Sequence, residues 1–391
     1  MAILETPGAR LSSPAAGSPA HAGPRHAAPS AAIAAAAIRP VNPTRRLLTR
    51  LLLLGFLALV LVLPLLVTNP YHMQVVLTGF IFAIGAYGLN IALGYTGLLS
   101  LGHAGFFGIG AYAVALLTSE QGWSFWPALV VAIVMSGGAG FIVGSICLRA
   151  KGHYLAIFTL AVGMIIYQVL DKWESLTNGP IGVVGIPGPS PIGPITFDSF
   201  TARYYLTAAF LLVAMLGAWR IRASLFGRTL LAIRMSEPLA AASGVNVMAA
   251  KRLAFTMACI YAGVAGGLYA SFIGFLGPDI AVVENTFNML LYVLLGGIAS
   301  VAGPLVGTML VYTLTQFLQA FQTYQMLVFG PALIALVIFL PYGITGAVTM
   351  IARRLFPDGP ARRGTASAAT SAPSPAAGRD QPWQRYLKHE D

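Results

Sequence analysis

The chain has 391 residues, of which 57% are hydrophobic and only 9% are charged, and its mean hydropathy is +0.78. Soluble globular domains have about a quarter of their residues charged, so this composition excludes that class and predicts a polytopic membrane protein. A net charge of +11 could indicate nucleic-acid binding, but the basic residues lie mostly beside apolar runs, as cytoplasmic loops require. We therefore interpret the charge as a topology signal and expect no nucleic-acid partner.

The two ends of the chain differ in composition from the middle. Residues 1–44 and 353–391 are rich in Ala, Pro, Ser and Arg and show no apolar period. Such segments cannot bury enough surface to offset the entropy of ordering, which predicts a disordered tail at each end. Residues 45–352 then form one transmembrane domain.

Ten apolar segments in this domain have roughly the length that crosses a bilayer core of about 30 Å. They lie at about residues 47–67, 73–93, 104–119, 126–148, 153–170, 203–220, 253–275, 286–301, 304–321 and 325–349. If the chain starts inside, alternating crossings place all but two of the 23 basic residues in the cytoplasm, Lys172 and Arg203 being the exceptions. The expected fold is an all-α polytopic membrane helix bundle of about ten transmembrane helices, with both termini cytoplasmic.

Closely spaced glycines interrupt the apolar pattern in two places. The first break, GLNIALGYTGLLSLGHAGFFGIGAY at 88–112, and the second, LLGGIASVAGPLVGTMLVYTL at 294–314, share a GxxS pattern. Glycine either lets neighbouring helices pack closely or lets the chain leave helical geometry where it lines a cavity. Paired interruptions in two halves of a transporter point to a substrate path. The candidate path residues are Asn90, Gly94, Gly97, Ser100, Gly102, His103, Gly297, Ser300 and Gly303.

The polar residues expected at membrane depth are almost all uncharged. Carboxylates occur only at span ends or in loops, which argues against coupling to protons or sodium ions. His103 lies between two glycines, and both a packing role and a direct substrate contact remain open for it. No nucleophile–base pair, metal-ligand spacing, CxxC or phosphate-binding loop occurs, so we expect no catalytic residue, metal or cofactor, and no enzymatic activity. If the protein works with ATP, another chain must hydrolyse it.

Two loops are longer than the others. The outer loop, 171–202, is dense in Gly and Pro, which predicts irregular structure. Within the inner loop, 222–252, Ser236 can cap a short helix that starts at Glu237 and Pro238 and ends near Gly244. This helix is either a docking knob for a partner or an amphipathic connector that lies on anionic lipid.

Five segments occur in an order that resembles the LivM-type (M-type) permease subunits of bacterial branched-chain amino acid ABC importers, over about residues 70–345. They are GLNIALGYTGLLSLGHAGFFGIGAYAVALL, KGHYLAIFTLAVGMI, LTNGPIGVVGIP, GRTLLAIRMSEPLAAASGVNVMAAKRLAFTMACIYAGVAGGLYA and LLGGIASVAGPLVG. The resemblance implies a bacterial inner-membrane subunit that forms half of a translocation path. The implied partners are membrane lipid, a sister permease of the LivH type, two cytoplasmic ATPase subunits and a periplasmic solute-binding protein.

The resemblance also places the family's ATPase-docking loop on residues 228–246. The residues it implicates are Arg228, Arg234, Glu237, Ala240, Gly244 and Asn246. Pro238 and Leu239 depart from the usual pattern, and Glu237 precedes the glycine by seven residues, where the general ABC importer pattern has six. Docking is still expected, although the angle of the short helix is left open.

Substrate class is the least determined part of this interpretation. Branched-chain or other hydrophobic amino acids are the expected substrates, but permeases with the same motifs resemble importers of urea, short amides or organic acids. Two further classes remain open: a stand-alone channel or proton-coupled carrier, and a membrane scaffold that transports nothing. The carrier would need an intramembrane carboxylate, and the scaffold leaves the paired glycine breaks without a purpose.

Overall fold

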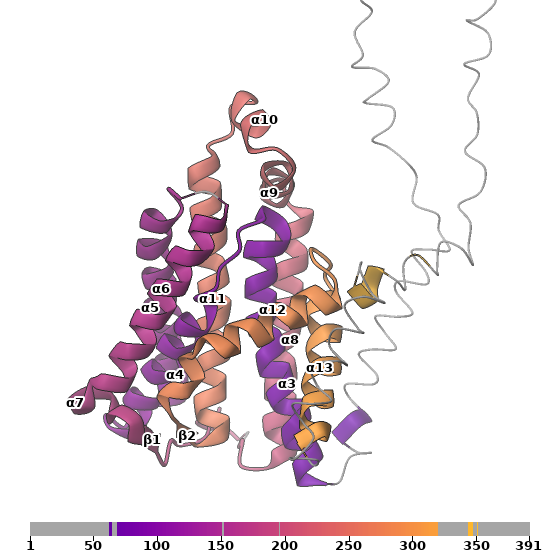
Figure 1. Ribbon diagram of the computed structural model, residues 1–391. Helices are drawn as coiled ribbons and strands as arrows, with labels where there is room; N and C mark the ends of the chain where they lie inside the picture. The colour runs from indigo at the N-terminus through magenta and orange to yellow at the C-terminus, as the bar shows by residue number, and fades with distance from the viewer. Residues whose placement is uncertain are drawn as a thin grey trace, which may run out of the picture. The chain divides into compact units, whose positions relative to one another are not determined.

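The computed structural model describes residues 62–64, 69–150, 152–194, 196–319, 343–346 and 350 (Figure 1). The chain divides into two units, Met1–Leu54 and Gly55–Asp391, and all described residues belong to the second. Both predicted tails, 1–44 and 353–391, lie outside the described residues. So do most of the first and last predicted spans, 47–67 and 325–349.

Each of the other predicted spans corresponds to a helix. These helices are α3 (Pro70–Leu89), α4 (His103–Ser119), α5 (Phe125–Cys147), α6 (His153–Lys172), α8 (Phe200–Ala223), α11 (Val247–Ile273), α12 (Val283–Gly296) and α13 (Gly303–Gln319). Among the described residues, α3 with its continuation to Tyr95, α5, α6, α8 and α11 are long and apolar enough to cross a membrane, and α4 is a shorter apolar helix. The chain is therefore a multi-pass membrane helix bundle.

The helix boundaries follow from capping residues. Asn69 accepts a hydrogen bond from the Tyr71 N–H at 2.9 Å and precedes Pro70 at the first helical position of α3. Asn246 caps α11 in the same way, accepting from the Ala249 N–H at 3.0 Å. At its other end α11 stops at Gly274, whose φ of 76° only glycine adopts readily.

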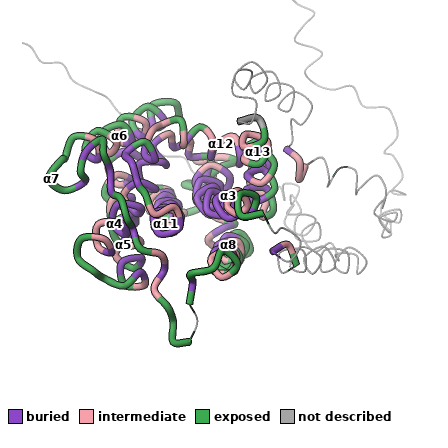
Figure 2. The backbone as a smooth tube through the Cα atoms, turned by 90° about the horizontal axis from the view of Figure 1, so that it is seen from below, coloured by how far each residue is buried: buried purple, intermediate pink, exposed green. Residues whose placement is uncertain are grey.

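Two helices form the centre of the bundle. The most apolar windows of α3 and α11 are 83% and 61% buried, whereas those of α5, α6 and α8 are 28–33% buried. Viewed along the bundle in Figure 2, α3 and α11 lie inside and the exposed faces belong to α5, α6 and α8. An outward apolar face is what a helix in contact with lipid presents, so this burial pattern agrees with a membrane bundle.

The short elements lie at the two ends of the bundle. At one end α9 (Leu225–Met235) and α10 (Glu237–Ala242) form the loop between α8 and α11. At the other end lie α7 (Glu174–Thr177), η2 (Gly179–Ile181), β1 (Val183–Val184), β2 (Phe275–Leu276) and η3 (Pro278–Ala281). The two long loops of the sequence therefore occupy opposite ends (Figure 1).

The predicted all-α fold did not include a pair of short strands, which the structure contains. Strands β1 and β2 pair antiparallel, with Val183 opposite Leu276 and Val184 opposite Phe275. Gly182 lets the two segments approach closely, since a Cβ there would overlap the Leu276 carbonyl oxygen. The ladder fastens the Gly- and Pro-rich loop to the end of α11, so this loop has regular structure that its composition did not indicate.

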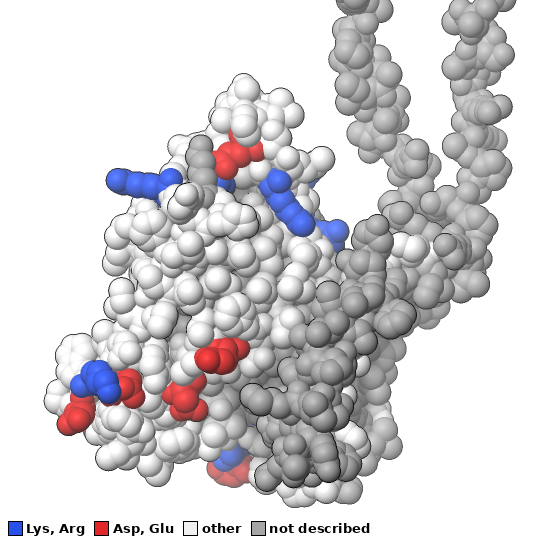
Figure 3. All heavy atoms as spheres, in the orientation of Figure 1, with Lys and Arg blue, Asp and Glu red and all other residues white. Residues whose placement is uncertain are grey.

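Charged side chains are sorted between the two ends. Among the described residues, every Lys and Arg except Lys172 and Arg203 lies toward the end that carries α9 and α10. Every described Asp and Glu except Glu237 lies toward the other end (Figure 3). This asymmetry is the pattern that membrane topology produces.

Candidate functional site

The first glycine break begins where α3 changes its helical period. The helix continues as the π-helix η1 (Asn90–Tyr95), and residues 96–102 then run without regular structure to α4. The Thr96 hydroxyl donates to the Ala92 carbonyl, and Gly97 turns the chain with a φ of 74°. A π-helical turn next to a glycine in the left-handed region gives a broken membrane helix, as the sequence predicted.

The second glycine break separates α12 from α13. Gly297 has a φ of 118° and Ala299, which is not a glycine, has a φ of 61°. Ser300 accepts a hydrogen bond from the Gly303 N–H at 2.7 Å and so starts α13. The Thr345 hydroxyl donates to the Gly296 carbonyl oxygen at 2.7 Å. It thereby satisfies a backbone carbonyl at the end of α12, where the helix supplies no N–H partner.

The two breaks contact each other through Asn90. Its Nδ2 donates to the Ser300 carbonyl oxygen at 3.0 Å, and its Oδ1 accepts from the Ala299 N–H at 2.9 Å. Gly94 lies beside this pair, because a Cβ there would overlap Oδ1 of Asn90. The structure therefore brings Asn90, Gly94 and Ser300 together, although the two breaks are some two hundred residues apart in sequence.

The joined breaks reach the surface of the chain. Asn90 and Gly94 are buried, but Gly97 is exposed and the Ile298 side chain is 37% exposed. Broken backbone is tolerated at membrane depth where it is buried in protein or lines a cavity. The joined segments are therefore buried at Asn90 and Gly94 and exposed at Gly97 and Ile298.

Other glycines of the first break serve helix packing. A Cβ at Gly102 would overlap the Thr159 carbonyl oxygen of α6, and one at Gly110 would overlap the backbone of Gly263 in α11. These contacts agree with the packing interpretation of small residues in membrane helices. Gly303 packs in the same way against the backbone of Gly296 and Gly297.

His103 and Ser100 are both buried. The Nε2 atom of His103 lies 2.9 Å from the Gly85 carbonyl oxygen of α3, and its side chain is 1% exposed. The Ser100 hydroxyl is buried and has no hydrogen-bond partner among the described residues. The position of His103 supports the packing interpretation, because its polar edge already has a partner within the bundle.

The inner loop is held by caps and one ion pair. Ser236 caps α10, accepting from the Leu239 N–H at 3.4 Å. Lys251 of α11, which is buried, donates to Glu237 at 2.7 Å. Ala240 is the buried residue of α10, and Gly244 reverses the chain with a φ of 82°. Together with the Asn246 cap, these contacts show that several predicted docking residues shape the loop from inside.

Two further residues that the loop exposes were not predicted, beside the exposed Arg228, Arg234, Gly244 and Asn246. The side chains of Met235 and Leu239 are 89% and 68% exposed at the tip, on either side of the Ser236 cap. Sequence reasoning missed them and treated Leu239 only as a departure from a pattern. Two apolar residues that flank a helix cap in a charged loop are the signal that could have identified them.

The two arginines of α9 differ in their contacts. Both are exposed. Arg234 also donates from its guanidinium to the carbonyl oxygen of Gly94 in the adjacent η1. The structure therefore joins one predicted docking residue to one predicted path residue.

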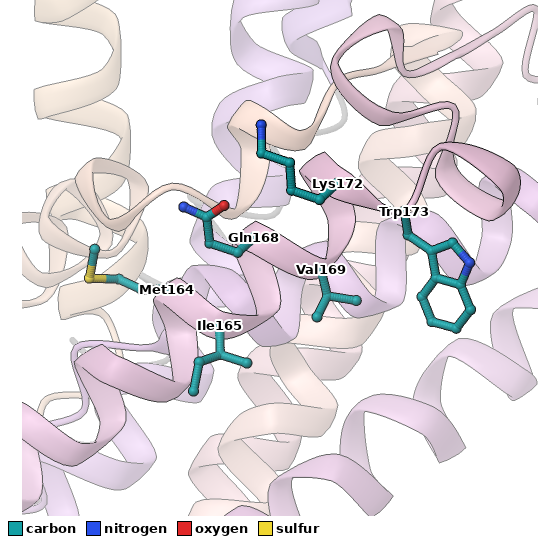
Figure 4. A pocket seen from close by; sticks show the side chains of 6 residues that line it. All are labelled: Met164, Ile165, Gln168, Val169, Lys172 and Trp173. Carbon is teal, nitrogen blue, oxygen red and sulfur yellow. The ribbon is translucent and has the colours of Figure 1, made fainter.

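A shallow hollow of about 590 Å³ lies on the outward face of α6 (Figure 4). Its lining residues come from the second half of α6 and the residue after it, namely Met164, Ile165, Gln168, Val169, Lys172 and Trp173. None of the candidate path residues lines it. Among the described residues, no group of His, Cys, Asp or Glu side chains is arranged to hold a metal ion.

Comparison with known proteins gives one family and several relatives. Residues 71–338 match the family described as branched-chain amino acid transport system permease component. The chain is 32% identical over 317 residues to the high-affinity branched-chain amino acid transport system permease protein LivM of Escherichia coli K12. That alignment covers 75% of this chain and 74% of the relative. The Salmonella typhimurium LivM protein is 30% identical over the same shares of both chains.

A more distant relative carries a different name. The autoinducer 2 import system permease protein LsrC of Enterobacter sp. strain 638 is 26% identical over 278 residues, which are 67% of this chain and 76% of the relative. No solved structure matches the chain.

Proposed function

Because the chain belongs to the family of branched-chain amino acid transport system permease components, we propose that it is the membrane permease subunit of an ABC importer for branched-chain or other hydrophobic amino acids. The family is one of transport components, and in this proposal the chain itself catalyses no reaction. The observation that carries the proposal is the contact of Asn90 with Ala299 and Ser300, which joins two broken helices within one chain.

In this proposal the chain lies in the bacterial inner membrane with about ten spans, residues 45–352, and has both termini in the cytoplasm. The sorting of the described charges supports this orientation, with the α9–α10 end inside. The loop 171–202 is then periplasmic, and the loop 222–252 is cytoplasmic.

The path is formed by two permease subunits. A sister permease of the LivH type covers the exposed surface at Gly97 and Ile298, and the path runs between the chains. The broken helices present backbone groups and neutral side chains, which can pass a zwitterion by transient hydrogen bonds. Since Gly102 and His103 pack inside this chain, the proposed contacts with substrate centre on Gly97, Ile298 and the residues next to them.

Two cytoplasmic ATPase subunits drive the transport cycle, and one of them docks on α10. The exposed Met235 and Leu239 side chains are the proposed contacts, with Arg228 at the rim. Glu237, Ala240, Gly244 and Asn246 hold the loop in shape for that contact. A periplasmic solute-binding protein delivers the substrate to the other end, where the β1–β2 ladder gives the outer loop a fixed form. ATP binding then favours one of two arrangements of the path.

The proposal is tested by reconstitution. We expect the purified chain alone to hydrolyse no ATP. With the sister permease, the ATPases and the binding protein in proteoliposomes, it should take up leucine, isoleucine or valine only when ATP is present. Collapse of the proton gradient should leave uptake unchanged. Flux without the ATPases would instead support a stand-alone channel or carrier, and robust ATP hydrolysis by the single chain would overturn the assignment.

A second substrate class has one observation in its favour. The similarity to a permease named for autoinducer 2 import indicates that permeases related to this chain are associated with more than one kind of solute. Urea, short amides and organic acids are the alternatives for this chain. Direct uptake of each radiolabelled compound in the same proteoliposomes distinguishes them. If leucine is not transported and one of these compounds is, the substrate assignment changes while the permease role remains.

A further inference from the structure

Arg234 contacts the first glycine break at Gly94 and lies near Gly97. Its guanidinium donates to the Gly94 carbonyl oxygen, and a Cβ placed on Gly97 would lie 3.4 Å from Cγ of the same arginine. The last carbonyls of a helix have no partner within the helix, and a cationic side chain can satisfy them. Arg234 therefore caps the end of η1 from a different part of the chain.

The helix that carries Arg234 is packed on η1 as well. Leu230 lies four residues earlier on α9, so the two side chains share one face of the helix. Leu230 is fully buried in a cluster with Ile91 and Tyr95 of η1 and Ala254 of α11. A displacement of α9 must therefore displace η1 or separate this cluster.

The second glycine break joins the same cluster. Ala299 packs against it, and the N–H of Ala299 is held by Asn90 of η1. Thus α9, η1 and the backbone between α12 and α13 meet around one set of buried side chains.

On its other side, Arg234 adjoins the docking helix. Only Met235 separates it from the Ser236 cap of α10, and Glu237 at the start of α10 pairs with Lys251. This short connection contains no glycine and ends in a capped helix. A shift of α10 therefore displaces Arg234 as well, because no flexible residue between them absorbs the movement.

From these contacts we infer that Arg234 is a positioning residue, which links the ATPase-docking helix α10 to both glycine-broken segments through Gly94 and Asn90. The inference rests on the proposed function. It assigns Arg234 a role inside the subunit, in contrast to a direct contact with the ATPase. When α10 moves, the guanidinium moves the end of η1, and Asn90 carries that movement to Ala299 and Ser300.

The test compares substitutions in the complete importer, reconstituted with its sister permease, ATPases and binding protein. Arg234→Gln removes the guanidinium but keeps a polar side chain, whereas Arg234→Lys keeps the charge and can donate a hydrogen bond. Arg220→Gln is the matched control, since Arg220 is an exposed arginine in the last turn of α8 at the same end of the bundle. ATP hydrolysis and leucine uptake are measured on the same vesicles.

We expect Arg234→Gln to assemble and to hydrolyse ATP at about the normal rate, but to transport roughly tenfold less leucine per ATP, as the loss of a charge-assisted hydrogen bond implies. Arg234→Lys should recover part of this ratio, and Arg220→Gln should match the unmodified importer. An unchanged ratio in Arg234→Gln overturns the inference. So does a proportional loss of both activities, which would indicate docking or folding.

A second measurement follows the proposed movement directly. Ile298 is exposed on this chain where the proposed path runs between the two permeases, so a cysteine introduced as Ile298→Cys is open to labelling from the path, whereas the native Cys147 and Cys259 are buried. We expect its rate of maleimide labelling to change when the ATPases are trapped with ATP and vanadate, and this change to disappear when Arg234→Gln is added. A change that persists in the double variant overturns the inference. If the unmodified importer moves no leucine, the proposed substrate fails, and the labelling result still decides the role of Arg234.

Discussion

The side chain of Asn90 holds the backbone at Ser300, with its Nδ2 atom 3.0 Å from the Ser300 carbonyl oxygen. The same amide accepts from the Ala299 N–H, so its donor and its acceptor are both used by one strained loop. Ala299 is one of the described residues other than glycine that have a positive φ. Such a conformation costs on the order of 1–3 kcal/mol and persists only where surrounding contacts hold it.

Asn90→Leu tests this clamp, by which we mean the two hydrogen bonds from the Asn90 amide to Ala299 and Ser300. The substitution keeps a similar volume but leaves two part-buried backbone groups without partners, at about 1–3 kcal/mol for each group. We expect a lower Tm of the purified chain in detergent, measured by intrinsic fluorescence. Thr315→Val is the control, because the Thr315 hydroxyl bonds only the Val311 carbonyl of its own helix at 2.8 Å. Equal Tm values for the two variants would show that the clamp adds no stability.

Gly102→Ala tests packing between α4 and α6. A methyl group at this position would overlap the Thr159 carbonyl oxygen, so the helices must separate, at about 1–3 kcal/mol or more. Gly138→Ala in α5 is the matched control, because a Cβ there meets nothing within 4 Å. The control should be neutral, or stabilise the helix by up to about 1 kcal/mol. We expect a loss of Tm and yield for Gly102→Ala only, and the opposite order would refute the packing role.

Gly97→Ala should act differently from Gly102→Ala. Gly97 has a φ of 74°, so alanine there costs roughly 1–2 kcal/mol in backbone energy. Its methyl group would meet Cγ of Arg234 at 3.4 Å and no other atom of the described residues within 4 Å. The subunit should still fold and assemble, while leucine uptake per ATP falls. Assembly is followed by co-purification with the ATPases. Failure of assembly before any loss of uptake would place Gly97 among the packing glycines.

His103→Ala is expected to affect stability and leave substrate recognition intact. The imidazole fills a site between α3 and α4 and bonds the Gly85 carbonyl oxygen at 2.9 Å. Its removal should lower the Tm, since a buried acceptor loses its partner at about 1–3 kcal/mol. The KM for leucine in proteoliposomes should stay within about twofold after correction for the amount of folded protein. A large rise in KM at normal Tm would restore His103 as a substrate contact.

The ion pair of Lys251 with Glu237 is suited to a double-mutant cycle. Lys251 is the more buried partner, with 11% of its side chain exposed against 38% for Glu237. Glu237→Ala leaves the Lys251 ammonium group without its partner, whereas Lys251→Met replaces that group with an apolar side chain. Glu237→Ala should therefore lower the stability more than Lys251→Met does. We expect a coupling of about 1 kcal/mol in Tm-derived stability, because one partner is partly solvated. If the effects of the two single substitutions on stability are additive, the ion pair does not stabilise the loop.

Much of the fold could be predicted from the sequence because length and hydropathy determine a membrane helix. Predicted spans 153–170 and 203–220 correspond to α6 and α8 within a few residues, and the breaks at Gly97 and Gly297 occur where glycine clusters predicted them. The β1–β2 ladder could not be predicted in this way, because each strand has two residues and no period to read.

The roles of single residues were harder to predict than their positions. Gly97 and Gly102 look alike in the sequence, yet one turns the chain at the surface and the other packs against a neighbouring helix. Arg234 matched a docking motif, but its contact with Gly94 depends on the fold that brings α9 onto η1. These differences arise from tertiary contacts between distant segments, on which a local pattern carries no information.

Helix α11 continues for 27 residues, or about 40 Å, with no proline. Lys251 near its start is paired with Glu237 of α10, and its last turn leads through Gly274 directly into β2, which is paired with the outer loop. The two ends of the bundle are thus connected by one continuous set of backbone hydrogen bonds. A tilt of α11 would therefore move the outer ladder and the Lys251–Glu237 pair together, in opposite directions along the membrane plane.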